Sequence, residues 1–424
     1  MYMQAFRRLA ESATRVRGVS ELRRAFIPGT PADKSPDELL AYIDGDDPVA
    51  QRPFIQVLLD ELTRAADGDG QALTFERSTP RLLEPDTEEN LRAIFERERW
   101  TDFLPIVLPT EERVREMLAG TSRSADDVVG RMSPTFYGRE AWELTVEKVA
   151  VNAVMAGARP EHLPVILALA ASGVTARQSS VSSIGTGAIV NGPIRNELEM
   201  NYGIGALGPY NRANAAIGRA YGLLSQNLQG GSVPGETYVG SLGNNFSYNS
   251  MTFAENEEAS PWAPLHVRRG HDQSESTVTP FIQLRNYNVT FGVRGSWREK
   301  LREMLVALNP TSGVMLMIDP SAARVLAERE GMASAEAMLD WMHETATLPA
   351  RRWWDHWGTE QRLKPLGERG VEPWATRLRA DPDEQLTMFP REEMELVVVG
   401  GETNPVYAVA SGLCPRTVSV DEWR

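Results

Sequence analysis

The sequence predicts an α/β protein with a mixed or mostly parallel sheet and flanking helices, preceded by a mainly helical N-terminal region. Three observations support this prediction: strand-like runs alternate with helical patterns from about residue 285 onward, two apolar helical runs lie near mid-chain, and the N-terminal part is charged and interrupted by prolines. A chain of 424 residues can form one large or two medium domains. We predict a helical N-terminal region at residues 1–104 and an α/β core domain at residues 105–424.

Helix-start signals and breaks define the first helices of the core domain. Thr110 is a hydroxyl N-cap residue, and the acids Glu111 and Glu112 follow it in the first turn, where they favour the helix dipole. Two apolar helical runs then follow in "TVEKVAVNAVMAGARPEHLPVILALAAS", separated by residues 157–160, which read Gly-Ala-Arg-Pro. We expect both of these helices to pack in the core.

Three apolar runs predict strands in the C-terminal part of the chain. They read "YNVTFGV", "GVMLMI" and "ELVVV", and the helical patterns "WREKLREMLVAL" and "AARVLAERE" follow the first two. Ligands of open α/β sheets gather beyond the carboxyl ends of the strands, so the loops that begin at Arg294, Asp319 and Gly400 are candidates for a site. Each of these loops can also be a simple turn.

Composition and charge exclude several classes of function. The formal net charge of −14 argues against a nucleic-acid partner, because binding to phosphates requires clustered Lys and Arg. No apolar run approaches the ~20 residues of a membrane span, and the arginine-rich N-terminus lacks the apolar core of a secretory signal. Cys414 is the only cysteine, so intrachain disulfides and thiolate zinc clusters are excluded and a reducing cytoplasm is expected.

The stretch "GIGALG" at residues 203–208 has the glycine spacing of a dinucleotide-binding loop. Such a loop needs a buried strand before its first glycine and an acid about 20 residues further on. The preceding residues "NELEMNY" are polar, and no acid occurs between Glu199 and Glu236. We therefore expect neither a nicotinamide nor a flavin cofactor, and the sequence does not identify another.

What remains at this position is a glycine-rich loop that leads into a helix beginning near residue 211. The apolar residues of this helix fall in one stripe that should be buried: Ala213, Ile217, Ala220, Leu224 and Leu228. Amides of the loop, together with Arg212, would suit an anion such as a carboxylate or a phosphate. The alternative is that Arg212 and Arg219 pair with acids of this acidic protein.

A second polar stretch, "AENEEASPWAPLHVRRG", brings glutamates and a histidine close together in sequence. In an extended chain, Glu255 and Glu257 point to one face, and Asn256 and Glu258 point to the other. Two carboxylates on one face can raise one another's pKa, which is a route to a general acid. His266 can act as a base or as a metal ligand. The same residues are also typical of a solvated acidic turn.

Signals for a metal site or a nucleophile are weak. The five histidines show neither HxH nor HxxxH spacing, so no metal site is predicted. The stretch "SSVSSIGTG" lacks the GxSxG pattern of a serine nucleophile and is interpreted as a polar loop. A lone cysteine is more typical of a small buried residue than of a nucleophile, and a reactive thiol at Cys414 is kept as a third hypothesis.

Several stretches together resemble the bacterial UGSC-like (seleno)proteins, a family named for its Sec-Gly-Ser-Cys motif. They are "EKVAVNAVMAGARPEHLPVILAL", "NGPIRNELEMNYGIGALGPYNRANAAIGRA", "AENEEASPWAPLHVRRG" followed by "ESTVT", and the closing "VSVDEWR"; the resemblance covers residues 105–424. The chain departs from the family's longer members because it has no cysteine before Cys414, and therefore no Sec/Cys motif. The resemblance implies that the glycine-rich loop and the Glu/His stretch belong to one constellation.

The leading hypothesis is a cytoplasmic enzyme that acts on a small polar or anionic substrate by acid/base chemistry. The candidate catalytic residues are Glu257, His266, Glu255 and Glu258. The candidate substrate-binding residues are Asn191, Gly203, Gly205, Gly208, Arg212, Asn214 and Arg219. The alternative is a non-catalytic subunit that completes a site on a Sec- or Cys-bearing redox protein, and a homo-oligomer is also left open.

Overall fold

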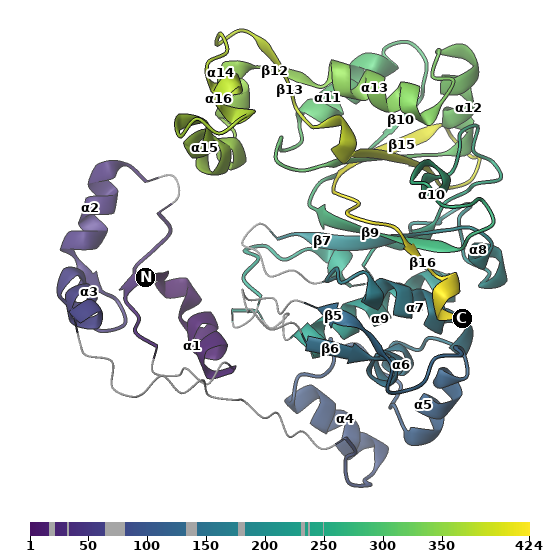
Figure 1. The fold of residues 1–424 in the computed structure, drawn as a ribbon, viewed down its shortest axis with the longest axis horizontal. Coiled ribbons are helices and arrows are strands. Elements are labelled where there is room, and N and C mark those ends of the chain that lie inside the picture. Colours follow the sequence, from purple (N-terminus) through teal and green to yellow (C-terminus); the bar gives the residue numbers. More distant parts are fainter. Residues whose placement is uncertain are drawn as a thin grey trace.

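Two four-stranded sheets lie one above the other in this protein, with helices on the outer side of each (Figure 1). The structure is a computed structural model, and it describes residues 1–16, 22–31, 34–63, 81–132, 142–176, 183–229, 234–235, 238–248 and 250–424. The resulting order of layers is helix, sheet, sheet, helix.

The lower sheet of Figure 1 has the strand order β16, β9, β7, β8. Its strands are β7 (Gly185–Asn191), β8 (Thr252–Ala254), β9 (Thr277–Leu284) and β16 (Val418–Ser419). β7 and β8 run parallel, whereas β9 runs antiparallel to both β7 and β16. The outer face is covered by α6 (Val146–Met155), α7 (Leu163–Ala171) and α9 (Arg212–Gln229). Because β7 and β8 are parallel, their carboxyl ends meet at the same edge of the sheet.

The upper sheet has the strand order β10, β15, β11, β14. Its strands are β10 (Tyr287–Phe291), β11 (Val314–Ile318), β14 (Met394–Val398) and β15 (Val406–Ser411). β11 and β14 run parallel, and β15 runs antiparallel to both of its neighbours. The outer face is covered by α11 (Trp297–Val306), α12 (Pro320–Arg329) and α13 (Ala335–Thr345).

The alternation of side chains along the strands explains how each sheet contributes to two layers of core. In β7, Ala188 and Val190 pack against the helices, whereas Ile189 between them packs toward the other sheet. In β11, Leu316 packs against the upper helices and its neighbour Met317 packs toward the lower sheet. Successive strand residues point to opposite faces, so a continuous apolar run supplies both layers at once.

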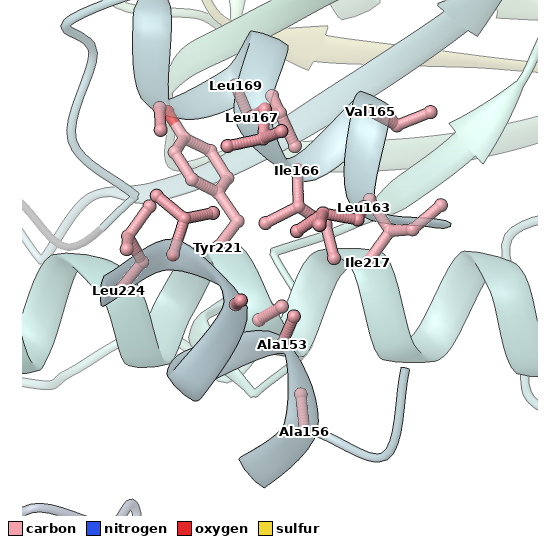
Figure 2. Packing of buried hydrophobic residues seen from close by; sticks show 14 of the residues in the cluster. Ala153, Ala156, Leu163, Val165, Ile166, Leu167, Leu169, Ile217, Tyr221 and Leu224 are labelled. Atoms are coloured by element: carbon pink, nitrogen blue, oxygen red, sulfur yellow. The ribbon is translucent and has the colours of Figure 1, made fainter. Parts of the chain in front are cut away.

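The helices under the lower sheet interlock through apolar side chains (Figure 2). Leu163 and Ile166 of α7 and Ile217 and Tyr221 of α9 are buried there. α6 meets them with small residues such as Ala153, so the helix backbones can approach one another closely. The Tyr221 hydroxyl donates to a backbone carbonyl at 2.7 Å, which satisfies the polar end of this buried ring.

The described part of residues 1–104 contains four helices and two small two-stranded sheets. The helices are α1 (Arg7–Val16), α2 (Pro36–Asp44), α3 (Phe54–Thr63) and α4 (Glu88–Arg97). The strand pairs are β1 (Tyr2–Met3) with β2 (Phe26–Ile27), and β3 (Asp46–Asp47) with β4 (Arg52–Pro53). Phe54 and Val57 form a small core with Ile27, whereas Phe95 of α4 packs into the large helix cluster. The mainly helical character of this region and its boundary at residue 104 stay predictions.

The remaining elements are short. They are α5 (Glu111–Leu118), β5 (Val128–Met132), β6 (Trp142–Thr145), α8 (Ile194–Glu197), α10 (Leu265–Arg268), β12 (Thr347–Pro349), α14 (Ala350–Trp354), α15 (Lys364–Glu368), α16 (Trp374–Leu378) and β13 (Gln385–Thr387). Single helical turns lie at Gln4–Phe6, Pro160–His162, Asn245–Ser247, Thr359–Leu363, Arg391–Glu393 and Asp421–Trp423. Within the described residues, no helix is both long and apolar enough to cross a membrane.

The predicted α/β class is confirmed at the coarse level, with mixed sheets that include parallel pairs. The N-cap at Thr110, the two apolar helices, the three C-terminal strands and the buried stripe on α9 are confirmed as well. The predicted mixed or mostly parallel sheet is divided, because the described strands form two separate four-stranded sheets and several two-stranded ones. The polar loop expected for "SSVSSIGTG" is wrong from Gly185 onward, where β7 begins; residues 179–182 lie outside the described residues.

Candidate functional site

Polar side chains gather where the two parallel strands of the lower sheet end. Asn191 is the last residue of β7, and Glu255 directly follows β8. The Asn191 amide nitrogen donates to Glu255 Oε2 at 2.6 Å and to Glu257 Oε1 at 3.0 Å. We call Asn191, Arg195, His266 and the three glutamates at positions 255, 257 and 258 the acid cluster.

Glu255 is the most deeply buried carboxyl of the acid cluster, with 1 % of its surface exposed. Its Oε2 atom accepts hydrogen bonds from the Asn191 amide and from the Leu265 backbone N–H, at 2.6 and 2.9 Å. Burial disfavours the charged form and raises the pKa of Glu255 to about 7, although the Leu265 N–H, the charge of Arg268 and the Asn191 amide oppose the shift. At neutral pH this carboxyl therefore exists in both protonation states.

Glu257 has a different environment from Glu255, because it contacts a guanidinium. Its Oε1 atom lies 3.0 Å from Arg195 Nε and also accepts the backbone N–H of Gly192 at 2.8 Å. Gly192 has φ +81°, and a Cβ atom there would lie 2.1 Å from the Glu275 carbonyl oxygen. Only glycine fits this turn without displacing Glu275 and Ser276, which lie just before β9, and the turn directs the Gly192 N–H toward Glu257.

Arg195 holds the acid cluster together, and the sequence reasoning did not single it out. It lies in the short helix α8, and only 3 % of its side chain is exposed. It donates to the Glu255 backbone carbonyl at 2.7 Å and to both carboxylate oxygens of Glu258, at 3.1 and 3.0 Å. Its guanidinium also lies 5.0 Å from the ring centroid of Tyr202. The one available signal was an arginine placed directly after an apolar residue in "GPIRNEL".

Glu258 lies at the solvent side of the acid cluster, with 53 % of its side chain exposed. Partial burial would raise its pKa, but the hydrogen bonds and charge of Arg195, a backbone N–H and the Asn196 amide together hold the pKa of Glu258 below its ordinary value. Asn256 points away, toward the upper sheet, where its amide donates to the Gly400 carbonyl at 3.0 Å. The alternation predicted for residues 255–257 is therefore confirmed, whereas Glu258 turns back toward Arg195.

His266 in α10 is fully buried beside Glu257. Its Nδ1 atom lies 3.9 Å from Glu257 Oε1, which is too long for a hydrogen bond, and its Nε2 atom lies 3.5 Å from the Gln273 carbonyl oxygen. Burial lowers the pKa of His266, which favours the neutral ring. A carbonyl can only accept, so we assign the ring proton to Nε2 from this contact, which leaves Nδ1 as an acceptor.

The glycine-rich loop does not join the acid cluster as a set of free amides. The Gly203 N–H donates to Asn201 Oδ1 at 3.0 Å, and the Gly208 N–H donates to the Gly205 carbonyl at 2.8 Å. The Asn214 amide, from α9, donates to two loop carbonyls at 2.9 and 3.2 Å. The expectation that these residues face an anion beside the glutamates is corrected: they hold the loop itself.

The two arginines of α9 also lie outside the acid cluster. Arg219 forms an ion pair with Asp102 at 2.9 Å and donates to two carbonyls of the segment that follows Asp102. Arg212 lines a surface hollow of about 380 Å³, together with Arg159 and His162. The sequence left two interpretations of Arg219 open, anion binding and pairing with an acid, and the ion pair with Asp102 confirms the second.

The other candidates have structural explanations. Asp319 caps α12 by accepting two backbone N–H groups, so the loop after β11 is a helix start. Burial, with Glu395 nearby, raises the pKa of the Cys414 thiol to about 12, which keeps it protonated at neutral pH. No group of three or more His, Cys, Asp or Glu residues that could hold a metal ion occurs in the part of the chain that the structure describes.

Comparison of the chain with protein-family models, with curated proteins and with solved structures found no match. The resemblance to the UGSC-like proteins therefore stays a prediction. The function must be inferred from the acid cluster itself.

Proposed function

We propose that this protein is an enzyme that moves a proton to or from a small polar substrate, with Glu255 as the proton-carrying group. One observation carries the proposal. The carboxylates of Glu255 and Glu257 accept hydrogen bonds from the same Asn191 amide, but of these two carboxylates only that of Glu257 contacts a guanidinium. The donors that Glu255 Oε2 meets, the Asn191 amide and a backbone N–H, are uncharged.

Such a pair of carboxyls in unlike environments is typical of acid/base catalysis. One group lies beside a cation, and the other keeps its proton because burial disfavours its charge. A carboxyl with a pKa near 7 can donate and accept a proton at neutral pH with little driving force lost. Glu255 therefore takes the role of acid or base, and Glu257 lies beside it in contact with Arg195. His266 Nδ1 is available as a second base.

The proton-carrying role of Glu255 can be tested without knowing the substrate. The full chain is labelled with ¹³C at the glutamate side-chain carboxyls and titrated by NMR, and the signal missing from E255Q is assigned to Glu255. The expected midpoint is near pH 7. A midpoint near the ordinary value of about 4.3 would overturn the proposal.

Activity gives the second test, once a substrate has been found by screening. E255Q preserves the shape and hydrogen bonding of the neutral carboxyl but cannot exchange a proton, so turnover should fall by about 100-fold or more. E258Q is the matched control: Glu258 lies in the same turn but is half exposed, and its loss should change turnover by less than about fivefold. Equal effects of the two variants would contradict the assignment.

Other features of the proposed enzyme rest on the sequence. We propose that the protein works in a reducing cytoplasm, because Cys414 is its only cysteine. A homo-oligomer and a Sec- or Cys-bearing partner stay predictions.

A further inference from the structure

Three buried polar atoms around the acid cluster have no hydrogen-bond partner among the described residues: Asn191 Oδ1, His266 Nδ1 and Thr277 Oγ1. Thr277 is paired with Asn191 across β7 and β9, so the two side chains lie on the same face of the sheet. A buried polar atom without a partner costs about 1–3 kcal/mol, and native proteins carry few of them. Their concentration beside Glu255 points to a place built for a ligand.

The chemistry of these atoms specifies the kind of ligand. The Asn191 amide gives its N–H groups to two glutamates, so Asn191 offers only its carbonyl oxygen as an acceptor. His266 Nδ1 is also an acceptor, and the Thr277 hydroxyl can accept. The ligand must therefore donate hydrogen bonds.

The charges around the acid cluster narrow the class of ligand further. The acid cluster contains three glutamates and one arginine, and Arg195 already directs its donors at Glu258 and at two backbone carbonyls. Arg268, whose charge also acts on Glu255, is paired with Glu395 at 3.2 Å, and its buried Nε atom has no partner among the described residues. The carboxylates still outnumber the arginines around Glu255, so we expect a cation to be favoured over an anion. This differs from the anionic substrate that the glycine-rich loop and Arg212 led us to expect.

We propose that the acid cluster binds a protonated amine that donates to His266 Nδ1, Asn191 Oδ1 and Thr277 Oγ1, with the Glu257 carboxylate as the nearby negative charge. Glu257 Oε1 already meets the Asn191 amide, the Gly192 N–H and Arg195 Nε within 3.0 Å, and it lies 3.9 Å from His266 Nδ1. An ammonium group that donates to His266 Nδ1 therefore lies near this carboxylate without displacing its donors. The inference rests on the proposed function, because it names the substrate class of the same site.

The test uses simple probes on the full chain, with the NMR midpoint of Glu255 as the readout. Methylammonium carries both charge and N–H donors, tetramethylammonium carries charge alone, and methanol carries a donor alone. Acetate is the anionic probe. A cation bound beside Glu255 stabilises its ionised form and lowers its midpoint, whereas an anion raises it.

We expect methylammonium chloride to lower the Glu255 midpoint saturably, and tetramethylammonium chloride at equal ionic strength, methanol and acetate to leave it unchanged. T277V, which removes one acceptor without a change of shape, should weaken methylammonium binding by about fivefold. T279V is the matched control, because Thr279 is equally buried in β9 but already bonded to Thr417 Oγ1 at 2.9 Å. It should leave the affinity unchanged.

The inference is overturned if methylammonium does not move the midpoint, if methanol or tetramethylammonium binds equally well, or if acetate raises the midpoint saturably. Equal effects of T277V and T279V would also overturn it. A midpoint near 7 in the free protein combined with any of these results refutes the ligand class alone. A midpoint near 4 in the free protein refutes the proposed function.

Discussion

The acid cluster and the glycine-rich loop at residues 203–208 are both polar, and they differ in how their polar groups are used. In the loop, backbone N–H groups donate to neighbouring loop atoms, and Asn214 bonds two further carbonyls. In the acid cluster, a carboxyl is buried and three polar atoms lack partners among the described residues. Polar groups that satisfy one another stabilise a shape, whereas buried groups left unpaired are available to a ligand.

The largest expected effect concerns Arg195, because both partners of its ion pair with Glu257 are largely buried. R195M leaves the Glu257 carboxylate without a cation, and the free energy of unfolding should fall by about 3–5 kcal/mol. Chemical denaturation at pH 7 measures this. A loss below about 1 kcal/mol would show that the acid cluster does not depend on Arg195.

Substitution of Asn214 tests the glycine-rich loop, the second region of the comparison. N214A removes a buried side chain that bonds Asn201 and Ala206, so the free energy of unfolding should fall by about 2 kcal/mol. The NMR midpoint of Glu255 should not move, because the loop's bonds are internal. A midpoint displaced by one pH unit or more would mean that the loop and the acid cluster act as one site.

Substitution of Arg212 should change the free energy of unfolding least. Its side chain is exposed and makes no hydrogen bond or ion pair with the residues that the structure describes. R212M should therefore change the free energy of unfolding by less than about 0.5 kcal/mol. It should also leave methylammonium binding unchanged. A loss of binding in R212M would place Arg212 in the site after all.

Much of the upper half of the fold follows from the sequence, because its strands are unbroken apolar runs and its helices have clear periodicity. β7 was missed because Gly185 and Gly187 weaken the strand pattern in "GTGAIVN". The structure explains Gly187: a Cβ atom there would lie 3.0 Å from the Met251 carbonyl oxygen. That close approach is a tertiary constraint, which local sequence patterns do not contain.

β9 was missed for a related reason. Pro280 lies inside this strand and cannot donate a ladder hydrogen bond, so the pattern favours an irregular segment. The strand tolerates proline because β16 is only two residues long and pairs with Thr277 and Val278, short of Pro280. The sequence of β9 does not reveal the length of β16, which comes from a distant part of the chain.

For the candidate site, the sequence identified the glutamates and His266 by their residue types and by alternation. The sequence could not separate Glu255 from Glu257, because their environments depend on burial and on the position of Arg195. It also missed Thr277, whose proximity to Asn191 depends on the register of β7 and β9. Residue types can be read from a sequence, whereas pairing and burial come from the fold.

The most direct measurement compares the pH dependence of stability in the wild type and in E255Q. Burial raises the pKa of Glu255 from 4.5 to about 7, so between these values the folded protein keeps a proton that the unfolded chain releases. The wild type should therefore lose about 3 kcal/mol of unfolding free energy relative to E255Q as the pH rises from 4.5 to 7, with no further change above pH 7. A stability difference that stays constant from about pH 4 to about pH 8 would contradict a buried, proton-carrying Glu255.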